Sequence, residues 1–194
     1  LSSAHPIIAS RSFKEMVIDF FSKKNFDEWL KTIQYDPMYP LIKDSGLFIS
    51  DPYKVSTGLS GREEAFMSKF TKDIPWVRMS ERAYLGFLNK LRVDTFKQIS
   101  TRFIKSGIDP EKEAHIFTSL ANFVNTASGR GSLGNFNKVA PELNTFLFSP
   151  RLIASRFNML NPAWYLRQPP QVRRESIKTM AEFIGVVSSI LMLS

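Results

Sequence analysis

The side chains with the most evident chemical potential lie between positions 109 and 136. The run Gly129-Arg130-Gly131-Ser132-Leu133-Gly134 has the glycine density of a phosphate-binding loop. A P-loop, however, follows a strand and continues from its second glycine into Lys and Ser or Thr, and that Lys reaches the terminal phosphates. Here Asn135 and Phe136 follow Gly134, and the residues before Gly129 have helical periodicity. The glycines therefore predict a tight turn between two helices, and we expect no cofactor and no small-molecule substrate.

Carboxylates and histidines offer little more. Asp109, Glu111 and Glu113 crowd one predicted helix start, where a negative charge interacts favourably with the helix dipole, so we expect them to cap that helix. General acid–base catalysis would also require a cleft and a partner group. The chain has no cysteine and two histidines, His5 and His115, which leaves almost no material for a metal site or a catalytic triad. The sequence therefore predicts no catalytic residue and no metal site, with any catalysis lying elsewhere on a longer chain.

The elements that carry these residues are predicted to be helices. Apolar residues recur at helical spacing along nearly the whole chain, and no two segments alternate with the period of paired strands. Behind Ser12, one apolar face comprises Phe13, Met16, Val17, Phe20 and Phe21. Asn25 is predicted to cap a second helix, with Glu28 in the capping-box position. The fold class expected is all-α, a bundle of about seven to nine helices with an apolar C-terminal helix.

The longest helix is predicted from Ser80 to about Ser106, with Gly107 ending it in the left-handed conformation. Its apolar stripe comprises Tyr84, Leu88, Leu91, Thr95, Ile99 and Phe103, and its cations are expected on the polar side. Asp109-Pro110 predicts the start of the next helix, which ends near Ser128-Gly129. That helix carries Ile116, Phe117, Leu120, Phe123 and Val124. Further helix starts are predicted at Ser60, Pro141 and Pro150, whereas Asn161-Pro162 and Pro169-Pro170 are expected to interrupt the helical pattern before the last helix.

The domain boundary is expected in a proline-containing and irregular stretch. Two prolines interrupt the helical pattern within Tyr35 to Pro40, and residues 44–60 have the composition of a loop. The sequence therefore predicts an N-terminal helical arm over 1–57 and a helical domain over 58–194. Because the chain begins at Leu1 and stops just after an apolar run, we expect it to be an ordered piece of a longer polypeptide.

Composition describes a globular and basic chain. Of the 194 residues, 43% are hydrophobic, too many for a disordered tail. Twenty-six Lys and Arg residues outweigh 18 Asp and Glu residues, giving a net charge of +8, so polyanions and acidic protein surfaces are natural partners. The candidate polyanion-binding residues are Arg151, Arg156, Arg167, Arg173, Arg174 and Lys178, with Trp164 and Tyr165 interleaved. These cations could contact DNA phosphates or lipid headgroups, or simply form a solvated face.

The C-terminal helix, predicted from about Val172 to Leu193, is apolar over most of its circumference. Crossing a bilayer takes about 20 apolar residues, and this run is shorter and contains Glu182. Three alternatives stay open: a buried core helix, a contact between copies, and the start of a membrane segment that continues past residue 194. The residues for an oligomer or membrane contact are Phe183, Ile184, Val187, Ile190 and Leu191.

Several strings taken together resemble a phage family. They are GREEAFMSKFTKDIPWVRMSERAYLGFLNKLR (61–92), ANFVNTASGRGSLG (121–134), LNTFLFSPRLIASRFNMLNPAWY (143–165) and PPQVRRE (169–175). In order and content these strings resemble the large polyvalent protein-associated domain of tailed phages and some conjugative elements. The resemblance covers about two-thirds of the chain, from near Gly58 to the end, and leaves residues 1–57 unmatched.

The resemblance implies a virion protein, packaged inside the capsid and delivered with the genome into the host envelope or cytoplasm. Similar proteins are internal virion or ejection proteins that help move DNA across the envelope, and others are fused to a transglycosylase or a virion RNA polymerase. The family supplies no catalytic residue for this domain. We therefore expect a structural, non-enzymatic domain whose partners are other virion proteins or copies of itself. DNA or the host membrane are further candidate partners, and a DNA- or lipid-binding accessory domain of a larger phage enzyme is the alternative.

Overall fold

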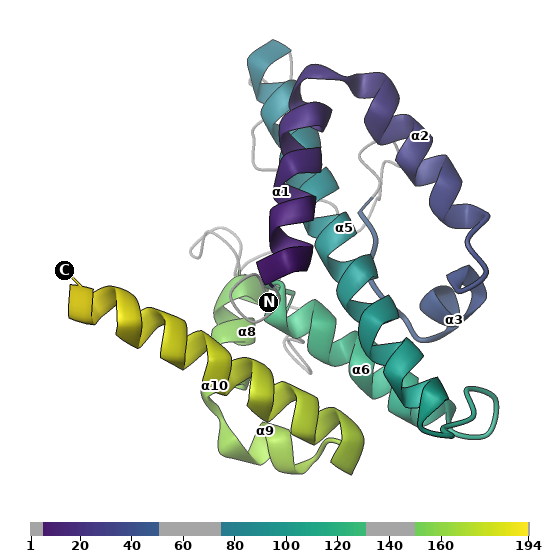
Figure 1. Ribbon diagram of the computed structural model, residues 1–194, viewed down its shortest axis with the longest axis vertical. Helices are drawn as coiled ribbons and strands as arrows, with labels where there is room; N and C mark the ends of the chain where they lie inside the picture. The colour runs from purple at the N-terminus through teal and green to yellow at the C-terminus, as the bar shows by residue number, and fades with distance from the viewer. Residues whose placement is uncertain (1–5, 51–74, 131–149, 194) are drawn as a thin grey trace.

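The computed structural model describes residues 6–50, 75–130 and 150–193, and most of these residues are helical (Figure 1). The helices are α1 (Pro6–Phe21), α2 (Lys23–Gln34), α3 (Tyr39–Asp44), α5 (Pro75–Lys105), α6 (Ala114–Ala127), α8 (Pro150–Leu160), α9 (Pro162–Leu166) and α10 (Pro170–Leu193). No strand occurs in these three ranges. The predicted all-α class is confirmed, and the eight helices seen in the described ranges agree with the predicted number.

The long helix α5 is the central element of the fold. α1 runs alongside it in the opposite direction (Figure 1). Glu15 pairs with Lys90 at 3.2 Å, and the charge of Arg11, one turn earlier on α1, lowers the pKa of Asp94, one turn later on α5. α2 and α6 also pack against α5, so that almost every residue from Leu85 to Ser100 is buried or half-buried. α5 is therefore surrounded by other elements along its middle and has no broad polar side there.

One hydrophobic core joins the N-terminal helices to the rest of the described chain. Its centre is built from α5 and α6 by fully buried side chains that include Phe96, Ile99, Phe117 and Leu120. The same cluster contains Ile33, Ile42 and Leu47 from the N-terminal segment and Val172 from α10. The predicted boundary at residue 57 lies outside the described ranges, but the segments before and after it share this core.

Three glycines end helices in the same way. Gly46, Gly107 and Gly129 have φ angles of 75°, 94° and 97°, in the left-handed region that only glycine adopts freely. After α5, Gly107 N–H donates to Ile104 and Ile108 N–H donates to Phe103, both at about 3 Å, which is the Schellman pattern. The predicted helix end at Gly107 and the predicted turn at Gly129 are confirmed.

Four predicted helix starts are wrong by several residues. α1 begins at Pro6, before Ser12, and α5 begins at Pro75, before Ser80. α2 is capped by Ser22, whose Oγ accepts from the backbone N–H of Asn25, so Asn25 is the residue that donates. Asp109 caps a turn through Glu111 N–H, an interaction that lowers the pKa of Asp109, and α6 starts only at Ala114. The predicted starts at Ser60 and Pro141 lie outside the described ranges, whereas that at Pro150 is confirmed. Asn161-Pro162, predicted to interrupt the pattern, instead begins the short helix α9.

The face of α1 that packs on α5 differs from the predicted one. Ser12 is buried, and Glu15 and Met16 are half-buried, whereas Phe13 and Val17 are exposed. The predicted apolar face of this helix is therefore wrong as a core-facing surface at Phe13 and Val17. Small side chains at the contact permit close approach of two helix backbones, a geometry that hydrophobic periodicity alone does not reveal.

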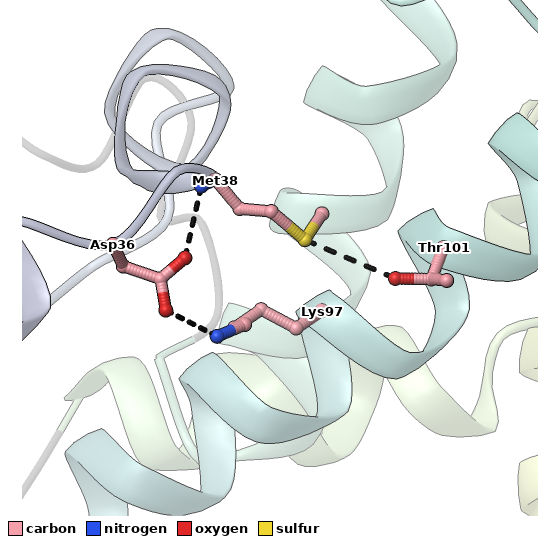
Figure 2. A network of polar contacts seen from close by, with 4 residues as sticks. All are labelled: Asp36, Met38, Lys97 and Thr101. Carbon is pink, nitrogen blue, oxygen red and sulfur yellow. Dashed lines mark hydrogen bonds and ion pairs between the residues drawn. The ribbon is translucent and has the colours of Figure 1, made fainter.

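A polar network ties the turn after α2 to α5 (Figure 2). Asp36 accepts the backbone N–H of Met38 at 2.9 Å and forms an ion pair with Lys97, while Thr101 donates to the sulfur of Met38. Burial raises the pKa of Asp36, but the hydrogen bonds from Lys97 and Met38 and the charge of Lys97 outweigh it, so the pKa lies below 3.8. The ionised carboxylate is thus more stable in the folded protein than in the unfolded chain.

We expect the stabilising contribution of Asp36 to be lost in acid. Because its folded pKa is lowered, the contribution is present above the unfolded value of 3.8 and decreases as the pH falls through the folded value. Asp36→Asn should lower the free energy of unfolding by about 1 kcal/mol at pH 7, and by less as the pH falls below 4. Urea unfolding of both proteins between pH 7 and pH 3 measures this difference. A difference that grew in acid would contradict the assignment.

Asp94 provides the opposite case on the same helix. Burial raises its pKa above 3.8, although Arg11, Lys97 and Lys90 lower it. The folded state therefore binds a proton more tightly than the unfolded chain does, and ionisation of Asp94 costs stability as the pH rises. Asp94→Asn serves as the matched comparison for Asp36→Asn. Relative to the unsubstituted chain, the free energy of unfolding of Asp94→Asn should rise as the pH rises, whereas that of Asp36→Asn should fall.

Candidate functional site

One buried asparagine, Asn89, and one half-buried asparagine, Asn125, hold the segment 46–50 against the helices. Asn89 of α5 accepts the N–H of Ser50 at 2.8 Å and donates to its carbonyl at 2.7 Å. Asn125 of α6 accepts the N–H of Phe48 at 3.0 Å and donates to the carbonyl of Gly46 at 3.1 Å. Each side-chain amide thus replaces the backbone partner that a strand would find in a sheet. These bonds join Ser50 to Asn89 across 39 positions of sequence and Phe48 to Asn125 across 77 positions, which indicates a structural role for both asparagines.

Two cationic side chains lie around the ring of Phe48. The guanidinium carbon of Arg130 is 3.3 Å from the ring centroid, and that of Arg92 is 5.5 Å from it. Arg92 is fully buried and donates from Nε to Ser128 at 2.8 Å. Lys90, two residues earlier on α5, is also buried, beside Glu15 and the ring of Trp29. The prediction that the α5 cations lie on the polar side is wrong for Lys90 and Arg92, because both contact neighbouring segments.

Helices α8, α9 and α10 form a compact unit next to α6 (Figure 1). Asn161 caps α9 by accepting the N–H of Ala163, with Pro162 in the first helical position. Tyr165 is buried, donates its hydroxyl to the carbonyl of Met159 at 2.6 Å, and has a pKa raised by burial. The rings of Trp164 and Tyr165 meet edge-to-face with their centroids 5.1 Å apart, and Trp164 also packs near Phe123 of α6. These two aromatic residues serve the core, so they do not offer a stacking surface for bases or lipid.

The candidate polyanion-binding residues have different environments. Arg173 donates from Nη2 to the carbonyls of Leu166 and Gln168 at 3.0 and 3.1 Å, so its charge is used to end α9. Lys178 lies 3.9 Å from Glu182 on the same helix. Arg156, Arg167 and Arg174 are exposed, on α8, at the end of α9 and on α10. Arg151 is in the first turn of α8, but its side chain lies outside the described part of the chain.

α10 is packed along its first half and exposed along its second. Val172, Ser176 and Thr179 are buried against the body, and Glu175 pairs with Arg102 of α5 at 2.9 Å. The C-terminal part of the helix leads away from the body (Figure 1). In this part Leu191 and Met192 are 70% and 85% exposed. We call residues 181–193 the distal half of α10.

The oligomer- or membrane-contact candidates all belong to this distal half. Phe183, Ile184 and Leu191 are exposed, and Val187 and Ile190 are helical in backbone, although their side chains lie outside the description. The alternative that α10 is a buried core helix therefore holds for its first half and is wrong for these exposed residues. The core alternative fails there because the helix extends past the helices against which it packs. None of the described helices is both long enough and apolar enough to cross a membrane.

Polar groups that could hold a metal ion are not brought together in the described ranges, where no group of three or more His, Cys, Asp or Glu side chains has suitable placement. His115 is exposed on α6, and Glu113 precedes that helix without a side-chain capping bond. His5 and the glycines from Gly131 to Gly134 lie outside the described ranges.

Comparisons of the chain with protein-family models, with curated proteins and with solved structures find no match in any of the three.

Proposed function

We propose that this chain is a structural, non-enzymatic domain of a phage internal virion protein, of the ejection type, that assembles with virion proteins. The observation that supports assembly is the distal half of α10, where Phe183, Ile184, Val186, Leu191 and Met192 are exposed. Large apolar side chains gathered on one protruding element are typical of a protein–protein contact. The phage setting rests on the resemblance of the sequence strings, and it implies packaging in the capsid followed by delivery to the host envelope or cytoplasm.

The assembly part of the proposal predicts self-association that one charge abolishes. We expect the purified chain to show concentration-dependent association in sedimentation experiments. Leu191→Asp should raise the dissociation constant at least about tenfold, since burying an unpaired carboxylate in an apolar contact costs more than 1.4 kcal/mol. The matched control is Ser189→Asp, which adds the same charge to an exposed position on the more polar side of the same turn. A chain that stays monomeric at all concentrations, or equal effects of the two variants, would contradict the proposal.

The virion setting has its own test. If the protein is packaged with the genome, mass spectrometry should detect it in purified particles and find it depleted from particles that have released their DNA. A protein found only in infected cells, and never in particles, would remove the virion assignment. That result would leave the self-association of the domain untouched.

A second candidate function, binding of DNA as an accessory domain of a larger phage enzyme, is favoured by the exposure of Arg156, Arg167 and Arg174. Replacing these three residues by Gln should lower the slope of log affinity against log salt by about three, because each phosphate contact releases counterions. The control replaces Lys24, Lys31 and Lys43, which are exposed on α2 and α3 and whose loss gives the same change of net charge. A fluorescence titration of duplex DNA from 50 to 300 mM salt measures both slopes. Equal slopes in the two triple variants would mean non-specific attraction only.

A further inference from the structure

We propose that the distal half of α10 pairs with the distal half of α10 in a second copy of the chain, with the two helices antiparallel. This inference rests on the assembly part of the proposed function and specifies its partner and its geometry. It assigns the same surface to both partners, so that the contact is closed by a two-fold axis.

The first argument is the continuity of one helix face. Positions 172, 176, 179, 183, 186 and 190 are separated by alternating steps of four and three, the spacing of a helix–helix contact. The first three residues of this face are buried in the molecule, whereas Phe183 and Val186 on the same face are exposed. Ile184 and Leu191 widen the exposed part on one side. The apolar face that packs α10 onto the body thus continues beyond the body, and another helix fits it.

The second argument concerns direction. The body of the molecule, through α6 and α9, already covers the face of α10 at Val172, Ser176 and Thr179. In a parallel pair, both bodies would lie at the same end and on the facing sides of the two helices, and they would compete for one space. In an antiparallel pair, each body lies beyond the end of the other helix. The overlap would span residues 180–193, about 20 Å at 1.5 Å per residue.

The third argument is electrostatic. After Lys178 the chain contains no Lys or Arg, and Glu182 is the one charged residue. Helices that bind lipid surfaces carry basic residues beside their apolar face, and DNA-binding surfaces depend on cations. The distal half of α10 lacks both features, so neither polyanion fits it. An uncharged apolar face is instead complementary to a copy of itself, because no like charges meet when two copies pair.

Crosslinking through introduced cysteines tests the geometry, because the natural chain has none. Met180 and Leu191 lie near opposite ends of the overlap. In an antiparallel pair centred near Val186, the two Met180 Cα atoms would be about 18 Å apart, beyond disulfide reach, while Met180 would lie close to Leu191 of the other copy. Oxidation of a mixture of Met180→Cys and Leu191→Cys chains should give a crosslinked dimer, whereas either variant alone should give at least tenfold less.

The outcomes separate this inference from the proposed function. Strong crosslinking of each variant with itself would overturn the antiparallel geometry, while self-association would stand. The same holds if neither the mixture nor the single variants crosslink at concentrations where sedimentation of the unmodified chain shows dimers, since the contact would then lie elsewhere. A monomeric unmodified chain would remove the assembly proposal itself. Binding of that monomer to phosphatidylglycerol vesicles, lost in Leu191→Asp, would make lipid the occupant and also overturn the inference.

Discussion

Phe117→Ala is expected to lower the free energy of unfolding by about 4 kcal/mol, and the melting temperature by about 10 °C. Phe117 of α6 is fully buried at the centre of the core and packs edge-to-face on Phe103 of α5, with ring centroids 6.4 Å apart. Truncation removes the transfer free energy of the ring and leaves a cavity that the surrounding helices fill only in part. Urea unfolding followed by circular dichroism measures the change.

The matched control is the same substitution at an exposed phenylalanine. Phe157 of α8 is 70% exposed, so Phe157→Ala should change the free energy of unfolding by less than about 0.5 kcal/mol. Both positions are helical, so the gain in helix propensity from alanine is shared and cancels in the comparison. Similar losses in the two variants would mean that α6 is not at the centre of the fold.

Asn89→Ala is expected to cost about 3 kcal/mol, the second-largest effect of a single substitution considered for this chain. The side chain makes both a donor and an acceptor bond to the backbone of Ser50, and it is fully buried. Removing it leaves a buried N–H and a buried carbonyl without these partners, at about 1–3 kcal/mol for each group. Thermal and urea unfolding both report the loss.

Two further variants identify the cause of the Asn89 effect. Asn122, exposed on the α6 helix, is the control, and Asn122→Ala should be neutral or slightly stabilising because alanine favours the helix. Asn89→Asp keeps an acceptor for Ser50 N–H but places a carboxylate against the Ser50 carbonyl, so it should also destabilise. Full stability in Asn89→Asp would show that the donor bond contributes nothing.

The parts of the fold that the sequence predicts well are those set by local pattern. The five predicted apolar residues of α6 are all buried, and its end at Gly129 follows from the glycine conformation. α5 shows where the same reasoning stops. Its Leu88, Leu91, Thr95, Ile99 and Phe103 are buried as predicted, while Tyr84 is exposed. Asn89, Lys90 and Arg92 are buried as well, because their partners come from segments 36 to 75 positions away, which no local spacing indicates.

Prediction of the candidate site had a comparable limit. An apolar run such as residues 183–193 has the same pattern in a core and in an intermolecular contact, and only the end of the neighbouring helices decides which part is covered. The basic stretch could not be divided from sequence either. Arg173 donates hydrogen bonds to the carbonyls at the end of α9, whereas Arg174, its direct neighbour, is exposed about 100° further around the helix. Whether an arginine serves the fold or a partner depends on these tertiary contacts.

The uneven support along α10 also predicts an uneven rate of amide hydrogen exchange. In the isolated chain, the amides of residues 181–193 are protected by their own helix alone, so fraying at the C-terminus exposes them to solvent. Amides in the first half of α10 open only when Val172 and Thr179 leave the core, and they should exchange with deuterium orders of magnitude more slowly. The boundary between fast and slow exchange should therefore fall within one turn of Thr179. At concentrations where the chain associates, slowed exchange would extend along the helix beyond that turn.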